Sequence, residues 1–206
     1  MKIMTQNANL LSERMHTTQL AQELMDQEIT LLALKDGSQL SAQCLAQSLE
    51  EQGQRCSWVW FPDGADCNDG ENGTAFLCLD RTIRSVDRFS LNNGSESGNH
   101  TASTALGIQI EGMEDWFYCL SQDLSADHPD QWKLLNGSIA GKWLCNTVWL
   151  LGIRPQWQGN PAGSWFAAAD GKILCSRRRE IRSYTGDRQK KLLPYTLGAA
   201  VIEVEE

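Results

Sequence analysis

The chain has 206 residues, of which 41% are hydrophobic and 21% are charged, and its formal net charge is −8. This length and composition fit one globular domain over residues 1–206, with a sizeable core and no run of the roughly 20 apolar residues that span a membrane. The negative net charge opposes tight, non-specific DNA binding, which depends on many Lys and Arg contacts to phosphates.

The first third of the chain alternates between strand and helix patterns. In chain order we expect a strand at 2–9, a helix at 13–28, a buried strand at 29–36, a helix at 38–53 and a strand at 56–62. Ser38 is a candidate N-cap for the second helix, and Gly53 is its expected stop. The N-terminus lacks the long apolar centre of a signal peptide, so we expect a cytoplasmic protein unless a leader was removed.

The rest of the chain is richer in strands. We expect loops at 63–73 and 92–100, paired strands at 74–80 and 84–91, a hairpin at 104–112 and 115–123, a helix at 128–143, and strands at 145–152, 171–176 and 196–205. Early alternation followed by hairpins predicts an α/β (α+β) fold in which two packed mixed sheets are flanked by helices.

The seven cysteines are scattered and form no CxxC pair. Several lie inside the apolar runs FLCL, FYCL, WLCN and ILCS, which favours buried free thiols over a zinc site. The chain also has eight tryptophans. Most are expected in the core, although Trp157 and Trp165 lie in a predicted loop and are candidates for a binding platform.

Several segments resemble the endonuclease/exonuclease/phosphatase family, whose fold is the four-layer sandwich of pancreatic deoxyribonuclease. IMTQNAN is similar to the opening strand, which ends in T-x-N, and ITLLALKD lies where the family has a strand ending in Gln-Glu. NGTAFLCLDRTIRSVD is similar to the family's G-x-A-I-L-S-R-x-P-I stretch, and NTVWLLGIRP to its G-D-x-N strand end. The resemblance covers nearly the whole chain in element order and implies the same sandwich.

The resemblance also implies a site. In the family, an acid and an amide hold a divalent cation, and a His–Asp pair activates the nucleophile. Asn7 matches the first-strand amide, and Asp36 stands at the metal-binding Glu position, preceded by Lys35. Ser121, Gln122 and Asp123 replace the Thr-His loop.

Other family positions have lost their chemistry. Gly152 is retained, but Ile153 and Pro155 stand where Asp and Asn are expected, and neither side chain binds a metal or carries a proton. Pro194, Tyr195 and Thr196 occupy the Ser-Asp-His region, and the chain's three histidines are His16, His100 and His128. A general base that contributes roughly 10²–10⁴ in rate is therefore missing.

Each candidate residue has a functional and a structural interpretation. Asn7 and Asp36 hold a cation, or Asp36 is a surface acid at a strand end. Lys35 and Arg154 bind phosphate without a metal, or they are solvated loop charges. Tyr195 is a further phosphate ligand or a half-buried strand residue.

The run containing Asp123, Asp127 and His128 has two interpretations as well. It supplies an acid and a base, or it is the acidic first turn of a helix.

Three functions compete. The leading interpretation is a catalytically reduced protein of this type, acting as a binding or interaction module without a cofactor, with an unidentified ligand or protein partner and a phosphorylated small molecule as candidate. The second is an active Mg²⁺-dependent phosphodiesterase or nuclease in which Asp36, Asn7 and Asp123 hold the metal and Arg154 stabilises the transition state. The third is an unrelated α/β domain, which would lack two stacked sheets.

Overall fold

The computed structural model describes residues 1–8, 14–63, 72–91, 104–121, 129–152, 165–168, 173–177, 181–183 and 200–204, and the helices and strands lie within these ranges. The helices are α1 (Arg14–Asp26), α2 (Gln39–Glu51) and α3 (Pro129–Cys145). The strands are β1 (Lys2–Asn7), β2 (Leu31–Gly37), β3 (Cys56–Pro62), β4 (Gly73–Leu79), β5 (Ile83–Ser90), β6 (Thr104–Ile110), β7 (Trp116–Leu120), β8 (Val148–Leu151), β9 (Phe166–Ala168), β10 (Ile173–Cys175), β11 (Ile181–Ser183) and β12 (Ala200–Val204).

The strands form two six-stranded sheets, with orders β11-β12-β1-β2-β4-β3 and β5-β6-β7-β8-β10-β9. Each sheet is mixed and contains one parallel pair, β1 with β2 in the first and β7 with β8 in the second. The carboxyl ends of two parallel strands lie at the same edge of their sheet, so residues that follow β1 and β2 meet there.

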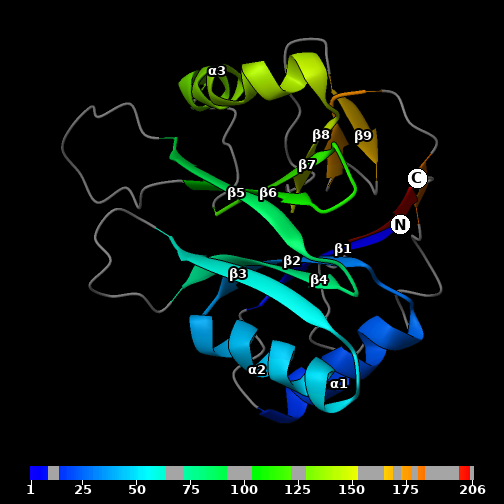
Figure 1. Cartoon of the computed structure of the whole chain (residues 1–206). Coiled ribbons are helices and arrows are strands. Elements are labelled where there is room, and N and C mark those ends of the chain that lie inside the picture. Colours follow the sequence, from blue (N-terminus) through cyan, green and yellow to red (C-terminus); the bar gives the residue numbers. More distant parts are fainter. Residues whose placement is uncertain are drawn as a thin grey trace.

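Four layers result from how the strands and helices bury their apolar faces (Figure 1). Alternate residues of both sheets interlock in one core between them, which includes Ile3, Phe76, Phe117 and Trp149. The opposite face of the first sheet packs against α1 and α2, and that of the second sheet packs against α3. The predicted sandwich of two mixed sheets flanked by helices is confirmed, and the two stacked sheets contradict an unrelated α/β architecture.

Most predicted elements of the first third are found within a few residues of their expected ends. The Ser38 side chain accepts a hydrogen bond from the Ser41 N–H at 3.0 Å and caps α2. Gly53 follows α2 with φ +83°, in the left-handed region that glycine tolerates.

The predicted pairing of 74–80 with 84–91 is wrong. β4 joins β2 and β3 in the first sheet, whereas β5 pairs with β6 in the second. The chain between Leu79 and Ile83 therefore crosses from one sheet to the other. A short connection between two strands has similar residues whether it forms a hairpin or crosses between sheets. Here the difference is visible in β4, which is buried on both faces.

The segment before β8 also differs from the prediction. The strand expected from residue 145 begins at Val148, because α3 continues to Cys145, which is exposed. Among the six described cysteines, all of them free, Cys78, Cys119 and Cys175 are buried as expected, and Cys44 and Cys56 are half-buried. The short strands β9 and β11 were not expected.

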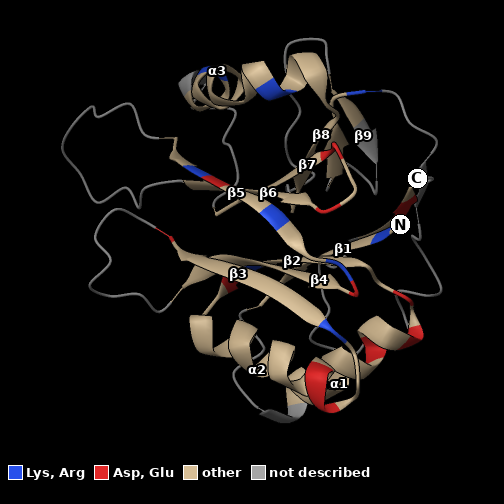
Figure 2. Ribbon diagram, in the orientation of Figure 1, with Lys and Arg blue, Asp and Glu red and all other residues tan. Residues whose placement is uncertain are grey.

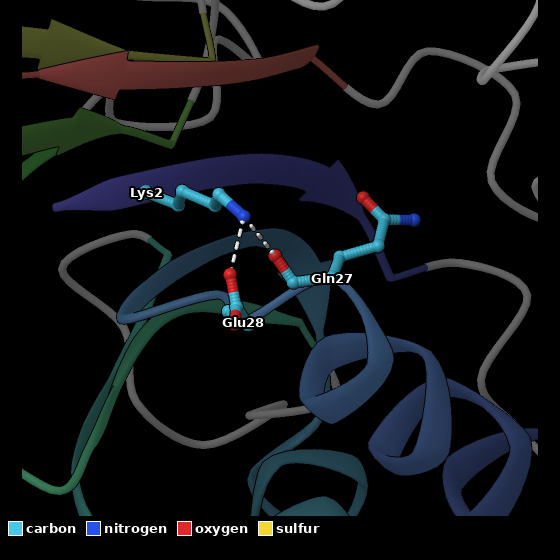
Figure 3. A network of polar contacts seen from close by, with 3 residues as sticks. All are labelled: Lys2, Gln27 and Glu28. Atoms are coloured by element: carbon cyan, nitrogen blue, oxygen red, sulfur yellow. Dashed lines mark hydrogen bonds and ion pairs between the residues drawn. The ribbon is translucent and has the colours of Figure 1, made fainter.

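A polar network holds the end of α1 against the start of β1 (Figure 3). The Lys2 ammonium donates to the Gln27 carbonyl at 3.0 Å and pairs with the Glu28 carboxylate at 2.8 Å. The Glu28 carboxylate is largely exposed, so this ion pair contributes little by itself, and its effect is to fix the turn that leads into β2. None of the helices in the described part of the chain combines the length and apolarity of a membrane span.

A second network joins β5, β7 and α3. The Tyr118 hydroxyl donates to the Asp87 carboxylate at 2.7 Å, and the same oxygen receives the Lys142 ammonium. That ammonium also lies 4.5 Å from the centroid of the Trp116 ring. Tyr118 is fully buried, and Gly107 faces it across the β6–β7 pair, where only a residue without a Cβ leaves room for the ring.

Gly107→Ala is expected to lower the free energy of unfolding by about 1–3 kcal/mol, because the new Cβ would lie 2.2 Å from the Tyr118 ring. Gly137→Ala in α3 is the matched control, since its Cβ would meet nothing within 4 Å. The control is expected to stabilise the protein by about 0.5–1 kcal/mol through helix propensity. Urea denaturation of both variants measures the difference, and equal effects would contradict the packing at Tyr118.

Candidate functional site

Polar side chains gather at the edge where β1 and β2 end. Asn7, the last residue of β1, lies opposite Lys35 in the parallel register of the two strands. The Ala8 N–H then donates to the Lys35 carbonyl at 2.7 Å, which holds the chain leaving β1 beside β2. This edge contains the side chains for which the resemblance implies a site.

Asn7 and Asp36 contact one another directly. The Asn7 Nδ2 donates to Asp36 Oδ2 at 2.7 Å. Asp36 has φ +55°, and the register of β2 with β4 shifts between Leu34 and Gly37. Successive side chains of a regular strand point to opposite faces, but this irregularity re-aims the carboxylate toward Asn7. Aspartate tolerates the left-handed conformation better than most residues.

Lys35 connects the two sheets at this edge. Its side chain leaves β2 on the face toward the second sheet, and its ammonium donates to the Gly152 carbonyl at 2.9 Å. Only 9% of Lys35 is exposed, so the charge is largely withdrawn from water and needs compensating partners.

Gly152 follows β8 with φ +73°, and a Cβ at this position would lie 2.8 Å from Lys35 Cδ. A glycine at position 152 therefore permits both the left-handed backbone conformation and the close packing of the Lys35 stem.

A second carboxylate, Asp63, follows β3. The Thr74 hydroxyl donates to Asp63 Oδ1 at 3.3 Å, and the Asp63 N–H donates to the Asn72 carbonyl at 3.0 Å. Burial raises the pKa of Asp63 to about 6, and the negative charge of Asp36 adds to the rise. The Thr74 hydrogen bond and the positive charges of Lys35 and Arg88 act in the opposite direction on that pKa.

Arg88 brings a second cation to this edge from the other sheet. Its guanidinium donates to the Pro62 carbonyl at 3.2 Å and lies 5.0 Å from the centroid of the Phe61 ring. Unlike Lys35, it is exposed. Figure 2 shows basic and acidic residues on β5, and further acidic residues at the ends of α1 and α2, on the outer side of the first sheet. The edge thus combines two carboxylates with one buried and one exposed cation.

The structure tests the predicted residues unevenly. It brings together Asn7, Lys35 and Asp36 with Gly152, the glycine that the resemblance places at the end of β8. Asp123, Arg154 and Tyr195 lie outside the described residues. Ser121, at the start of the Thr-His replacement, is buried, and its hydroxyl accepts the Thr104 N–H at 2.8 Å. It therefore continues the β6–β7 pairing at the open end of the hairpin.

Asp63, Thr74 and Arg88 were missed as site residues. Asp63 was assigned to a loop, although it follows Pro62 at a strand end much as Asp36 follows Lys35. Its partner Arg88 was hidden by the mistaken pairing of β4 with β5.

The predicted binding platform is wrong for Trp165. Its side chain is only 9% exposed and packs against Trp143, with the ring centroids 4.9 Å apart. It belongs to the core between the second sheet and α3. Its predicted partner, Trp157, lies outside the described residues.

The described residues do not fit a divalent cation. Such ions take several oxygen ligands, most often carboxylates, and the described part of the chain has no group of three or more His, Cys, Asp or Glu side chains that would hold one. The Lys35 ammonium also shares the edge with both carboxylates. A buried positive charge beside a divalent ion opposes the binding of that ion by electrostatic repulsion.

Comparison with known proteins shows the fold. No protein-family model matches the chain, and no curated protein matches it significantly. Among solved structures, it is similar to an endonuclease/exonuclease/phosphatase family protein from Leptotrichia buccalis C-1013-b, with 13% identity over 100% of both chains and a TM-score of 0.68.

Two further structures have the same architecture. A mannosyl-6-phosphatase from Bacteroides thetaiotaomicron is 10% identical over 100% of both chains, with a TM-score of 0.65. TDP2 from Caenorhabditis elegans is 12% identical, with 98% of this chain and 72% of that chain covered and a TM-score of 0.63. Identities this low relate the folds alone. The chain therefore has the endonuclease/exonuclease/phosphatase fold that the sequence resemblance implies.

Asp63→Asn is expected to stabilise the protein at pH 7.5 and to have little effect at pH 4. A carboxyl group whose pKa rises on folding contributes stability below its unfolded pKa of 3.8 and loses it as pH rises through about 6. Asparagine keeps an oxygen for the Thr74 hydroxyl and cannot ionise.

Urea midpoints of wild type and variant between pH 4 and 7.5 measure this effect. Asp80→Asn, which removes an exposed carboxylate from another left-handed position, is the control. An advantage of Asp63→Asn that does not grow with pH would contradict the environment described for Asp63.

Proposed function

We propose that this protein is a catalytically reduced relative of the phosphoesterases with this fold, a pseudoenzyme that binds a ligand instead of hydrolysing it. The observation that carries the proposal is the buried Lys35 ammonium, which lies at the edge formed by Asn7, Asp36 and Gly152 and donates to the Gly152 carbonyl at 2.9 Å. By the resemblance, this edge is where a metal-dependent enzyme would hold its cation.

The residues expected for hydrolysis support the same proposal. In the resemblance, Asp and Asn follow the glycine at the end of β8, whereas this chain has Ile153 and Pro155 at those positions. Neither side chain accepts a proton or binds a metal. Without them, water lacks both a base to deprotonate it and a metal to polarise it, and retaining the fold does not compensate for either group.

The ligand class follows from the charges at the edge. Lys35 and Arg88 are cations from different sheets, and the second is exposed. Cationic side chains bind phosphate without a metal, and a guanidinium matches two phosphate oxygens in plane. A phosphorylated small molecule is therefore the proposed ligand. Arg154, which is predicted to follow β8, and Tyr195 remain predicted contributors to its binding, and a cytoplasmic location remains a prediction of the sequence.

One observation favours the second candidate function. The Asn7 amide and the Asp36 carboxylate are 2.7 Å apart, which is the acid–amide pair that the resemblance assigns to metal binding. In that alternative, Asp36 and Asn7, together with Asp123, hold Mg²⁺, and the protein is an active phosphodiesterase or nuclease with Arg154 near the reacting phosphate. The buried ammonium at the same edge opposes this arrangement electrostatically.

Hydrolysis assays distinguish the two functions. Wild type is incubated with Mg²⁺ or Mn²⁺ and with plasmid DNA, a bis-aryl phosphodiester or inositol phosphates, and no turnover above the buffer rate is expected. Inositol phosphates are also titrated calorimetrically in EDTA, where the binding heat is expected to persist. Turnover that Asp36→Ala abolishes would establish the enzyme instead, and absence of any anion binding would remove the proposed ligand class.

A further inference from the structure

We infer that the Lys35 ammonium is an internal substitute for a divalent cation: it neutralises the carboxylates at the strand ends, and its removal would open a divalent-cation site there. The inference rests on the proposed function and deepens it, because it explains how the fold keeps an acid–amide pair without a metal.

The position of the ammonium is fixed on both sides. On the first sheet, Lys35 lies in register with Asn7, and the next residue carries the carboxylate that Asn7 binds. On the second sheet, the ammonium donates to the Gly152 carbonyl, and the lysine stem packs against Gly152, where a Cβ would lie 2.8 Å from Cδ. A flexible surface lysine has no such constraint, so this charge stays at the edge.

Two carboxylates at this edge carry the negative charge that the ammonium would offset. The Asp36 carboxylate binds Asn7, which lies opposite Lys35 in the strand register, so the carboxylate and the lysine are neighbours at this edge. The charges of Asp36 and Lys35 also act in opposite directions on the pKa of Asp63. Arg88 is the other cation acting on Asp63, and its exposure to solvent leaves its charge screened. Lys35 is therefore the one of these two cations whose charge acts with little screening.

Lys35→Gln removes this charge and keeps a hydrogen-bond donor on a side chain that is one bond shorter. The substitution leaves Asp36 and Asp63 with less positive charge nearby, adds a side-chain amide oxygen, and releases the Gly152 carbonyl from the ammonium. Carboxylate, carbonyl and amide oxygens are the ligands that Mg²⁺ and Mn²⁺ prefer. The variant therefore gains both the charge balance and the donor atoms that the wild type lacks.

The test is Mn²⁺ binding by the full chain, measured by calorimetry and by electron paramagnetic resonance of the free ion. Lys35→Gln is expected to bind Mn²⁺ at least about 100-fold more tightly than wild type, since a buried charge acts with little screening. The gain is expected to disappear in the double variant Lys35→Gln with Asp36→Asn. Mn²⁺ is also expected to raise the melting temperature of Lys35→Gln and not that of wild type.

Lys2→Gln is the matched control. It removes one positive charge from β1, which brings the net charge from −8 to −9 as Lys35→Gln does, and Lys2 interacts with Gln27 and Glu28. Its Mn²⁺ affinity is expected to equal that of wild type. If Lys35→Gln does not fold, Lys35→Met, which keeps an apolar stem, is compared with wild type instead.

Two results would overturn the inference. One is a folded Lys35→Gln or Lys35→Met variant with the Mn²⁺ affinity of wild type. The other is a wild-type Mn²⁺ site that Asp36→Asn abolishes, which is decisive without any substitution of Lys35. Failure of the proposed function has a different signature, Asp36-dependent hydrolysis by wild type or absence of inositol phosphate binding in EDTA, so the two failures are distinguishable.

Discussion

A single positive charge held between two sheets constrains this end of the molecule. Burying an ammonium in an apolar interior costs several kcal/mol unless hydrogen bonds and opposite charges offset the loss of water. The Gly152 carbonyl supplies a hydrogen bond at 2.9 Å, and Asp63, on whose pKa the Lys35 charge acts, supplies opposite charge. Each of these groups lies at the end of a different strand, so satisfying Lys35 requires β2, β3 and β8 to end close together.

The apolar core explains how those strand ends are kept in position. Between the sheets, Ile3, Ala33, Phe117 and Trp149 are fully buried and close-packed. Lys35 follows Ala33 on the same face of β2 by the two-residue period of a strand. Along this face of β2, the interface between the sheets therefore changes from apolar at Ala33 to charged at Lys35. Close-packed protein interiors deform little. The core therefore holds the strand ends in position, and the polar contacts form between groups that are already close together.

The sequence predicts the fold better than the site because the two depend on different ranges of information. Periodicity and capping are local, which is why α2, with Ser38 at its start, and the strand that ends at Pro62 are found close to their expected places. The crossover after Leu79 depends on which sheet accepts β5, and no local pattern carries that choice. The end of α3 was also not predicted from local pattern. Its last turn extends to the exposed Cys145, although the sequence there resembles the start of a buried strand.

The grouping of polar residues at this edge was predicted where a residue follows directly from a strand end. Asn7 and Asp36 are such residues, and register places them together. Asp63 and Arg88 required the three-dimensional arrangement, because one follows β3 and the other belongs to the opposite sheet. The Asp36 bulge is also invisible in sequence: an aspartate at φ +55° next to Gly37 resembles an ordinary turn residue until its carboxylate is seen to bind Asn7.

In the proposed function, Lys35 would exchange one ligand class for another on a fold that phosphoesterases share. A carboxylate beside an amide attracts a divalent cation, and the cation in turn attracts phosphate. When an ammonium is built into the neighbouring strand position, the carboxylate already has its counter-charge, and free cations gain nothing further by approaching it. Anion attraction then depends on the protein's own cations. In the proposed function, hydrolysis is absent because no metal polarises water, and the exposed Arg88 guanidinium supplies the positive charge that binds phosphate.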